Sequence, residues 1–229
     1  MPLRRLFPAL AIMLVPVAAH AGDTQLWTTG IVQGAVGAGT GTQPMVWMEV
    51  QSRVGNDVSH LTVFTVRPGF GLRFGPDFNA LFGYQYQRNT PLAGRNIDEH
   101  RMWQQLTLPL YRDPEHLIFT TRLRLEERNV TVGHDLGWRA RVMLRMQVPL
   151  HGRGSAGPLL WSEAFFGLND TDWGQHHGLN QVRAFAGGVF PVSKHLNLEA
   201  GYMAQFDRTP GRYRRNNIVS LTLNYRLGV

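Results

Sequence analysis

The segment from Leu117 to Arg128 alternates between apolar and charged side chains. Successive side chains of a β-strand point to opposite faces, so this segment has one apolar face and one charged face. The segment from Leu136 to Val148 repeats the pattern. The charged faces of the two segments carry Arg122, Arg124, Glu126, Arg128, Arg139, Arg141 and Arg145. Consecutive strands of this kind are typical of a transmembrane β-barrel that is apolar outside and charged inside.

The same alternation extends over most of the chain, and no segment shows a sustained helical period. Turn residues such as Gly75-Pro76-Asp77 and Thr209-Pro210-Gly211 separate the strand-like segments. We therefore predict one all-β domain, a single antiparallel transmembrane β-barrel. The predicted strands are residues 24–35, 44–54, 59–73, 77–88, 97–110, 116–129, 135–149, 158–168, 178–190, 195–207 and 214–228.

The number of strands is set by a parity rule, because bacterial barrels of this class have an even number of strands. The pattern yields one segment too many for ten strands. We favour ten strands from residue 44 onward, with residues 24–35 as an extra N-terminal strand or a plug, and twelve strands is the alternative.

The connections sort into two ends of the predicted barrel. Counting back from the C-terminus, the short turns at residues 75–77, 111–115 and 191–195 share one end. The longer segments 90–98, 169–177 and 208–213 then share the other end. We expect a girdle of aromatic residues at a membrane interface beside the short turns, formed by Phe74, Phe78, Tyr111 and Phe190.

The first 21 residues have the features of a secretory signal peptide. Two arginines precede an apolar stretch from Leu6 to Ala18, and Ala19-His20-Ala21 has the small-x-small pattern of a cleavage site. The stretch is shorter than the roughly 20 residues of a membrane-spanning helix; an uncleaved anchor or a buried helix is the alternative. We predict a cleaved signal peptide over residues 1–21 and an outer-membrane β-barrel domain over residues 22–229, in a Gram-negative bacterium. The expected partners are outer-membrane lipid and, during biogenesis, the barrel-assembly machinery.

Lys194 is the one lysine among the 23 lysine and arginine residues of the chain, and there is no cysteine. The arginines recur at alternate positions inside predicted strands, whereas a nucleic-acid binder usually gathers lysine and arginine on an outer face. We therefore exclude nucleic acid as a partner. A soluble barrel of the lipocalin type also has alternating strands, but with its apolar faces inside. Aromatic apolar faces and clusters of arginine and glutamate favour the membrane orientation.

Several ordered motifs run through the chain after the leader. They are Arg67-Pro68-Gly69, Gly83-Tyr84, Glu99-His100-Arg101-Met102-Trp103-Gln104-Gln105, Arg122-Leu123-Arg124-Leu125-Glu126-Glu127-Arg128, Trp138-Arg139-Ala140-Arg141, Asn169-Asp170-Thr171-Asp172-Trp173-Gly174, Asn180-Gln181-Val182-Arg183 and Glu199-Ala200-Gly201-Tyr202. In these motifs the chain resembles the bacterial family catalogued as domain of unknown function 2490. The resemblance implies an exported outer-membrane β-barrel and no assigned activity. One departure is the C-terminus, Leu227-Gly228-Val229, where outer-membrane strands usually end in an aromatic residue.

The inward faces of the predicted strands carry the candidate lumen-lining and anion-binding residues. Besides Glu49, they are Arg53, Glu99, Arg101, Arg122, Arg124, Glu126, Arg128, Arg139, Arg141, Arg145, Glu163, Arg183 and Glu199. One interpretation is structural, because paired charges fill a small barrel at a tolerable desolvation cost. The other is a narrow channel or binding barrel whose excess of arginine attracts small anionic or polar solutes. The two roles are compatible, and the sequence does not identify the solute.

A loop on the presumed outer side gathers Asp170, Asp172, Trp173, His176 and His177. Together with His134 and Asp135 it has the residue types of a metal site or of an Asp/His site that activates water. No fixed ligand spacing is met, so we favour a solvated loop with an Asx-type turn, and we predict neither a metal nor a cofactor.

Two serine and histidine pairs are weak candidates for catalysis. Ser59 and His60 are adjacent, so they point to opposite faces of a strand, and Ser193 and His195 lie in a turn. We predict an outer-membrane β-barrel that is not an enzyme and has no catalytic residues. The alternatives are an outer-membrane lipase, lipid deacylase or protease with a loop active site, and a structural or adhesion barrel with a sealed interior.

Overall fold

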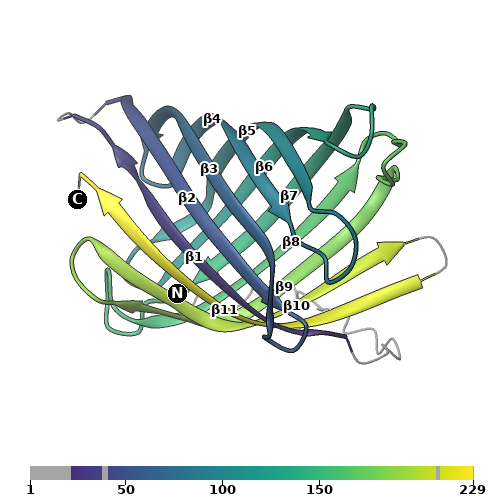
Figure 1. Cartoon of the computed structure of the whole chain (residues 1–229). Helices are drawn as coiled ribbons and strands as arrows, with labels where there is room; N and C mark the ends of the chain where they lie inside the picture. Colours follow the sequence, from purple (N-terminus) through teal and green to yellow (C-terminus); the bar gives the residue numbers. More distant parts are fainter. Residues whose placement is uncertain (1–21, 38–40, 210–211, 229) are drawn as a thin grey trace.

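The structure, a computed structural model, describes residues 22–37, 41–209 and 212–228, so the predicted signal peptide lies outside the described residues. Eleven strands form a closed barrel (Figure 1). They are β1 (Thr24–Ala35), β2 (Gln43–Gly55), β3 (His60–Gly75), β4 (Phe78–Asn89), β5 (Ile97–Asp113), β6 (Leu117–Val130), β7 (Gly137–Gln147), β8 (Gly157–Gly167), β9 (Gly178–Pro191), β10 (Leu196–Thr209) and β11 (Arg212–Leu227). The described residues contain no helix that is long and apolar enough to cross a membrane.

The barrel closes between β1 and β11, which run parallel, while the other neighbouring strands are antiparallel. Figure 1 shows these two strands side by side with their arrowheads at the same end. Pairing extends from Thr24 with Asn217 to Gly34 with Leu227. The predictions of ten strands and of twelve are therefore both wrong, and β1 is a full wall strand rather than a plug. An odd number of strands closes without an open edge because one pair of neighbours is parallel.

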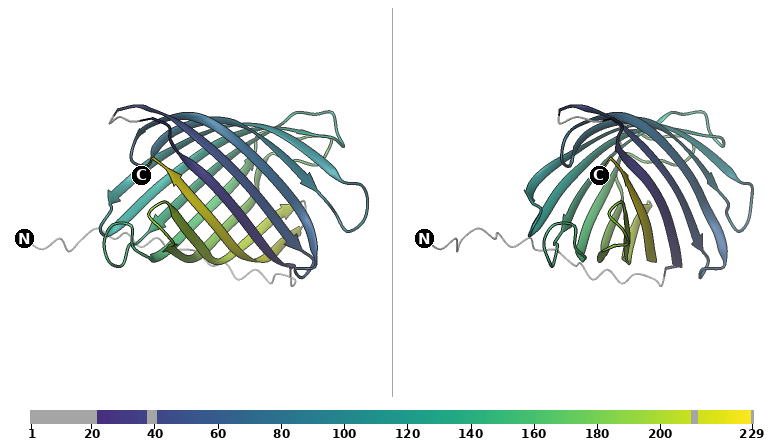
Figure 2. Two further views of the ribbon diagram at one scale, coloured as in Figure 1. Left: turned by 60° about the vertical axis from the view of Figure 1, so that its left-hand side comes forward. Right: turned by 90° about the vertical axis from the view of Figure 1, so that its left-hand side faces the viewer.

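The connections fall at the two ends of the barrel that the strand order predicts, but their lengths do not sort fully, because the β7–β8 connection, at the same end as the short turns, spans residues 148–156. The turns after β3, β5 and β9 lie at one end, here called the short-turn end, where the backbone N–H of Arg226 in β11 donates to His195. β1 begins at the opposite, long-loop end, where the backbone N–H of Asp57 donates to Asp23 at 2.9 Å. The predicted long connection over residues 208–213 is wrong, because β10 and β11 extend further than expected. Only residues 210–211, which lie outside the described residues, separate the two strands. The strands tilt steeply around the barrel axis (Figure 2).

The inside of the barrel is polar and its outside is apolar, as the alternation predicts. Glu126 and Gln85 have no exposed surface, whereas Leu123 is 41% exposed. Every strand presents at least one exposed apolar side chain to the surroundings. In the order β1 to β11, examples are Val32, Met48, Leu72, Phe82, Met102, Leu123, Val142, Leu160, Leu179, Tyr202 and Leu223. This arrangement is the reverse of that in a soluble lipocalin-type barrel.

Two apolar clusters on the inner wall flank the polar interior. One contains Met45, Trp47, Leu81 and Trp103; the other contains Trp27, Leu159, Phe185, Val189, Met203 and Ile218. Glycines make room for the largest rings. A β-carbon at Gly69 or Gly83 would lie 2.5 Å from the Trp103 ring, so only glycine lets this indole lie against the backbone of β3 and β4.

Candidate functional site

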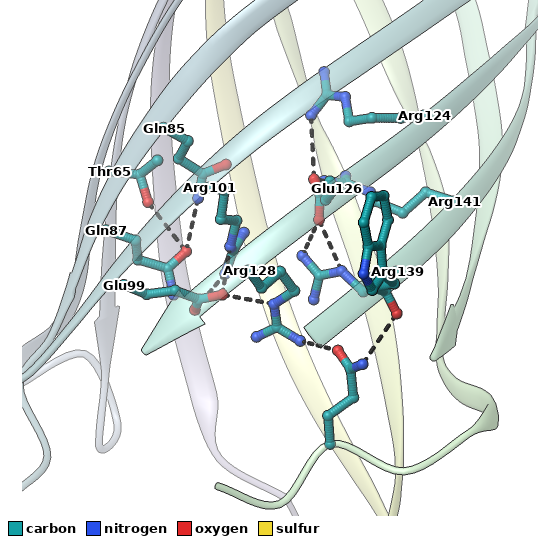
Figure 3. A network of polar contacts seen from close by, with 12 residues as sticks. Thr65, Gln85, Gln87, Glu99, Arg101, Arg124, Glu126, Arg128, Arg139 and Arg141 are labelled. Carbon is teal, nitrogen blue, oxygen red and sulfur yellow. Dashed lines mark hydrogen bonds and ion pairs between the residues drawn. The ribbon is translucent and has the colours of Figure 1, made fainter. Parts of the chain in front are cut away.

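A network of arginines and glutamates crosses the lumen, and Glu126 on β6 is its most buried carboxylate. Glu126 accepts hydrogen bonds from Arg139 and, at 2.7 Å, from Arg141, both on β7. The Arg124 guanidinium lies 3.9 Å away on the same strand as Glu126 (Figure 3). These strands are neighbours, and the inward positions bring the charges together because Arg139 pairs in register with Glu126. Three cations therefore surround one buried carboxylate.

Glu99 on β5 is a second centre of the network. It binds Arg101 on its own strand at 2.7 Å and Arg128 on β6 at 2.5 Å. Arg128 also donates to Gln175 at 2.9 Å, and Gln175 belongs to the connection between β8 and β9. This connection therefore reaches back into the lumen at the long-loop end.

The remaining glutamates of the lumen are paired too. Glu163 on β8 contacts Arg122 at 2.8 Å and Arg141 at 2.9 Å, so Arg141 bridges two carboxylates. Glu49 lies 2.6 Å from Arg67, and Glu199 lies 2.8 Å from Arg145. No carboxylate of the described lumen is left without a cationic partner, apart from Asp207 near the rim, which accepts from amide groups.

Between its rims, the described lumen contains more arginines than glutamates. The ten arginines are Arg53, Arg67, Arg101, Arg122, Arg124, Arg128, Arg139, Arg141, Arg145 and Arg183, and the five glutamates are Glu49, Glu99, Glu126, Glu163 and Glu199. Each of the residues predicted to line the lumen lies there. The described interior therefore carries an excess of positive charge.

The interior is not solid. A cavity of about 430 Å³ lies in the lumen and is lined by residues such as Thr222, Arg226 and Arg53. A second cavity of about 450 Å³ lies toward the long-loop end, beside Asn89, Val132 and Trp173. Both cavities touch the same group of side chains, Gln87, Arg128, Arg139, Phe165 and Gln181. This group lies where the two cavities adjoin.

The predicted loop site forms a clasp between two connections at the long-loop end. Asp172 accepts the backbone N–H groups of His134 at 2.8 Å and Asp135 at 3.2 Å. The Trp173 indole donates to the carbonyl oxygen of Asp135 at 2.8 Å. Gly133 supports this contact, because a β-carbon there would lie 2.5 Å from the Trp173 ring. These contacts attach the β8–β9 connection to the β6–β7 connection.

Asp170 is held in the same loop by histidines. The backbone N–H of His177 donates to Asp170 at 2.9 Å, its ring nitrogen lies 3.0 Å from the carboxylate, and the ring of His176 lies 3.7 Å away. The backbone hydrogen bond from His177 lowers the pKa of Asp170, and that from His134 lowers the pKa of Asp172. The described residues contain no group of three or more ligands able to hold a metal ion. The geometry is that of a structural loop.

The serine and histidine pairs do not meet as nucleophile and base. The Ser59 hydroxyl donates to the backbone carbonyl oxygen of Asn56 at 2.6 Å. Nε2 of His60 lies 2.8 Å from the backbone carbonyl oxygen of Thr90. The Ser193 hydroxyl accepts the backbone N–H of His195 at 3.3 Å, whose ring faces the carbonyl oxygen of Arg226. Each of these side chains contacts backbone groups in or beside a turn rather than the other member of its pair.

Sequence reasoning missed several lumen residues. Arg67 is 5% exposed and its inward position follows from the alternation of β3, so the pattern could have found it. The alternation of β5 likewise places Trp103 on the same face as Glu99 and Arg101, whereas Trp27 is apolar by type and its strand gives a weaker signal. Gln175 belongs to a loop, and no strand pattern predicts that it enters the barrel.

The fold and its interior define the class: a closed β-barrel with an apolar outer wall and a basic, ion-paired lumen. A family model for a protein of unknown function, DUF2490, matches residues 24–217, and the chain belongs to this family. An uncharacterized protein of Methylorubrum extorquens is 31% identical over 225 residues, which cover 96% of each chain. No solved structure matches the chain. The resemblance inferred from the motifs is confirmed.

Proposed function

We propose that this protein is an outer-membrane β-barrel, without enzymatic activity, through whose narrow lumen small anions pass. Its outer wall supports the location. Large apolar side chains are exposed on every strand, and in water such a surface would be far larger than the apolar patches that soluble monomers expose. Lipid solvates this surface, and the closed hydrogen-bonded wall leaves no unpaired strand edge in the membrane.

Aromatic residues at both ends of the outer wall support the same orientation. Phe74, Tyr111 and Phe190 are exposed beside the short turns. Near the long-loop end, the Tyr86 hydroxyl on β4 donates to Asp98 on β5 at 2.8 Å. An apolar ring with a polar tip suits the headgroup level of a bilayer.

The observation that carries the proposed activity is the excess of arginine in the lumen. Glutamates neutralise only part of this charge, and two cavities that share five lining side chains lie along the barrel. A low-dielectric wall focuses the field of the remaining cations onto the axis, so anions enter more readily than cations. The ion pairs that cross the lumen restrict the passage to small solutes.

Currents across a planar bilayer test the proposal. The mature protein is inserted with a potassium chloride gradient across the membrane, and the reversal potential is measured. We expect small single-channel currents whose reversal potential has the sign of chloride selectivity. Cation selectivity, or the absence of currents from protein whose unheated gel mobility shows a folded barrel, would overturn it. The second outcome would favour the sealed structural barrel.

The location is tested separately by cell fractionation. We expect the protein in the outer membrane, without its leader, and with a gel mobility that changes on heating. Recovery as a soluble periplasmic monomer would contradict the membrane assignment.

A further inference from the structure

Among the ten arginines between the rims of the lumen, two have no acidic partner among the described residues. Arg226 at the short-turn end, which lines the lumen cavity, has none among them either but is exposed to solvent. Arg67, Arg101, Arg122, Arg124, Arg128, Arg139, Arg141 and Arg145 each have a glutamate oxygen within 4.0 Å. Arg53 on β2 and Arg183 on β9 have none. Both line the cavity of about 430 Å³. Their charges are therefore not neutralised by a direct ion pair.

A glutamine orients each of the two guanidinium groups. Arg53 donates from Nε to Gln51 Oε1 at 2.8 Å, and Arg183 donates from Nε to Gln205 Oε1 at 2.9 Å. An amide oxygen fixes the direction of the guanidinium without cancelling its charge. The two terminal nitrogens of each group make no hydrogen bond within the described residues. These nitrogens form the fork that binds carboxylate and phosphate oxygens.

Trp27 on β1 brings the two arginines together. The Cζ atoms of Arg53 and Arg183 lie 3.9 and 4.8 Å from the centre of the same Trp27 ring, so they are at most 8.7 Å apart. The ring is fixed by packing in the cluster with Met203 and Ile218, and its Nε1 donates to Gln25 at 2.8 Å. Stacking on an aromatic ring stabilises each cation but supplies no counter-charge.

The nearest acidic groups are already occupied. Glu163 pairs in register with Arg183, but its two oxygens accept hydrogen bonds from Arg141 and Arg122. Asp207 accepts from Gln205 and Asn216. Two neighbouring cations that have no acidic group in direct contact are costly in a confined interior, and an anion from solution would complete the pair.

We propose that Arg53 and Arg183 form a binding site for a small oxyanion of the phosphate type within the lumen. This inference rests on the proposed entry of anions into the barrel and names where they bind. A dianion matches two uncompensated guanidinium groups, and its several oxygens match two forks. The cavity is large enough, since a water molecule takes up about 30 Å³ in the liquid.

Equilibrium dialysis of the mature protein in neutral detergent, with radiolabelled inorganic phosphate at low ionic strength, tests the site. We expect one phosphate per barrel, with at least a tenfold weaker affinity in Arg53→Gln and in Arg183→Gln. Arg145→Gln is the charge-matched control: it removes a lumen cation that is paired with Glu199, and we expect a change of less than threefold. Unheated gel mobility reports whether each variant is folded.

The outcomes separate this site from the proposed function. No phosphate binding by the unmodified protein, or an equal loss in all three variants, would overturn the site. If chloride-selective currents persist with no phosphate binding, the passage stands and the site is wrong. If phosphate binds with the expected dependence but no current flows, the site stands in a closed binding barrel.

Discussion

Replacing Arg141 by methionine tests whether the ion pairs of the lumen hold the barrel together. Arg141 donates to Glu126 Oε1 at 2.7 Å and to the two oxygens of Glu163 at 3.0 and 2.9 Å. Methionine is flexible and apolar, so the variant fills much of the space and removes three charge-assisted hydrogen bonds.

The expected loss of unfolding free energy depends on which arginine partners Glu126 and Glu163 retain in the variant. A hydrogen bond to a charged group contributes about 1.5–3 kcal/mol. Glu126 keeps Arg139 and Arg124, and Glu163 keeps Arg122, so the loss is smaller than the sum for three bonds. Removing one partner of a buried ion pair costs about 3–5 kcal/mol, and we expect the free energy of unfolding to fall by that amount.

The measurement is urea unfolding in lipid vesicles, followed by tryptophan fluorescence in both directions. Arg88→Met is the matched control, because Arg88 donates two hydrogen bonds of 2.8 Å to Asp98 with its side chain 48% exposed. Solvent screens an exposed pair of this kind, so we expect a much smaller loss in Arg88→Met than in Arg141→Met. A loss below about 1 kcal/mol in Arg141→Met, or a gain, would refute the reasoning, because repulsion among the arginines would then outweigh their pairing.

Three further substitutions or conditions test other parts of the structure. Leu123→Arg places a charge on the outer wall and should destabilise the barrel in lipid by about 2–4 kcal/mol, whereas Thr222→Val on the inner face should have little effect on the folded fraction. Gly83→Ala brings a methyl group 2.5 Å from the Trp103 ring and should destabilise by about 1–3 kcal/mol, whereas Gly30→Ala meets nothing within 4 Å. The hydrogen bond from His134 lowers the pKa of Asp172, so the loop clasp is present at neutral pH and is lost as the pH falls below the ordinary value of 3.8. Limited proteolysis of the loop, compared at neutral pH and at pH values below 3.8, measures the loss of the clasp.

Each of these predictions has a contradicting outcome. Equal assembly of Leu123→Arg and Thr222→Val would mean that the assignment of inside and outside is wrong. Equal stability of Gly83→Ala and Gly30→Ala would mean that Trp103 does not lie against β4. Loop cleavage that is unchanged on acidification, or unchanged in Asp172→Asn at neutral pH, would show that the carboxylate does not hold the clasp.

The alternation of side chains was enough to separate the two faces of most strands, and the aromatic apolar faces and the arginine and glutamate clusters then indicated which face lies inside. Arg122, Glu126 and Arg141 are inside and Leu123 is outside because a strand has no other way to separate them. The strand count was not predictable from the same pattern. The even-number rule for antiparallel barrels led us to count β1 (Thr24–Ala35) outside the ten-stranded wall. In the structure β1 pairs with both β2 and β11 and is therefore a wall strand.

Partner choice within the lumen also lay beyond the sequence. Glu163 stands opposite Arg183 in register, yet it binds Arg141 and Arg122, because side-chain reach rather than strand pairing decides the contact. Trp27 and Arg53 are paired on the consecutive strands β1 and β2, but the approach of Arg183 depends on β9, which is distant in sequence. Such juxtapositions arise from barrel closure, which no local pattern encodes.

Thiol labelling along β11 in intact outer membranes tests the central claim most directly. The chain has no cysteine, so Thr222→Cys and Leu223→Cys each provide a single reactive group. Thr222 lines the lumen cavity and Leu223 is 49% exposed on the outer wall. We predict that the lumen cysteine reacts faster with a sulfonate-bearing methanethiosulfonate than with a quaternary ammonium one, and that the outer cysteine reacts with neither. Rapid reaction of Leu223→Cys with both reagents, or a preference of Thr222→Cys for the cation, would contradict a lipid-embedded barrel with a basic lumen.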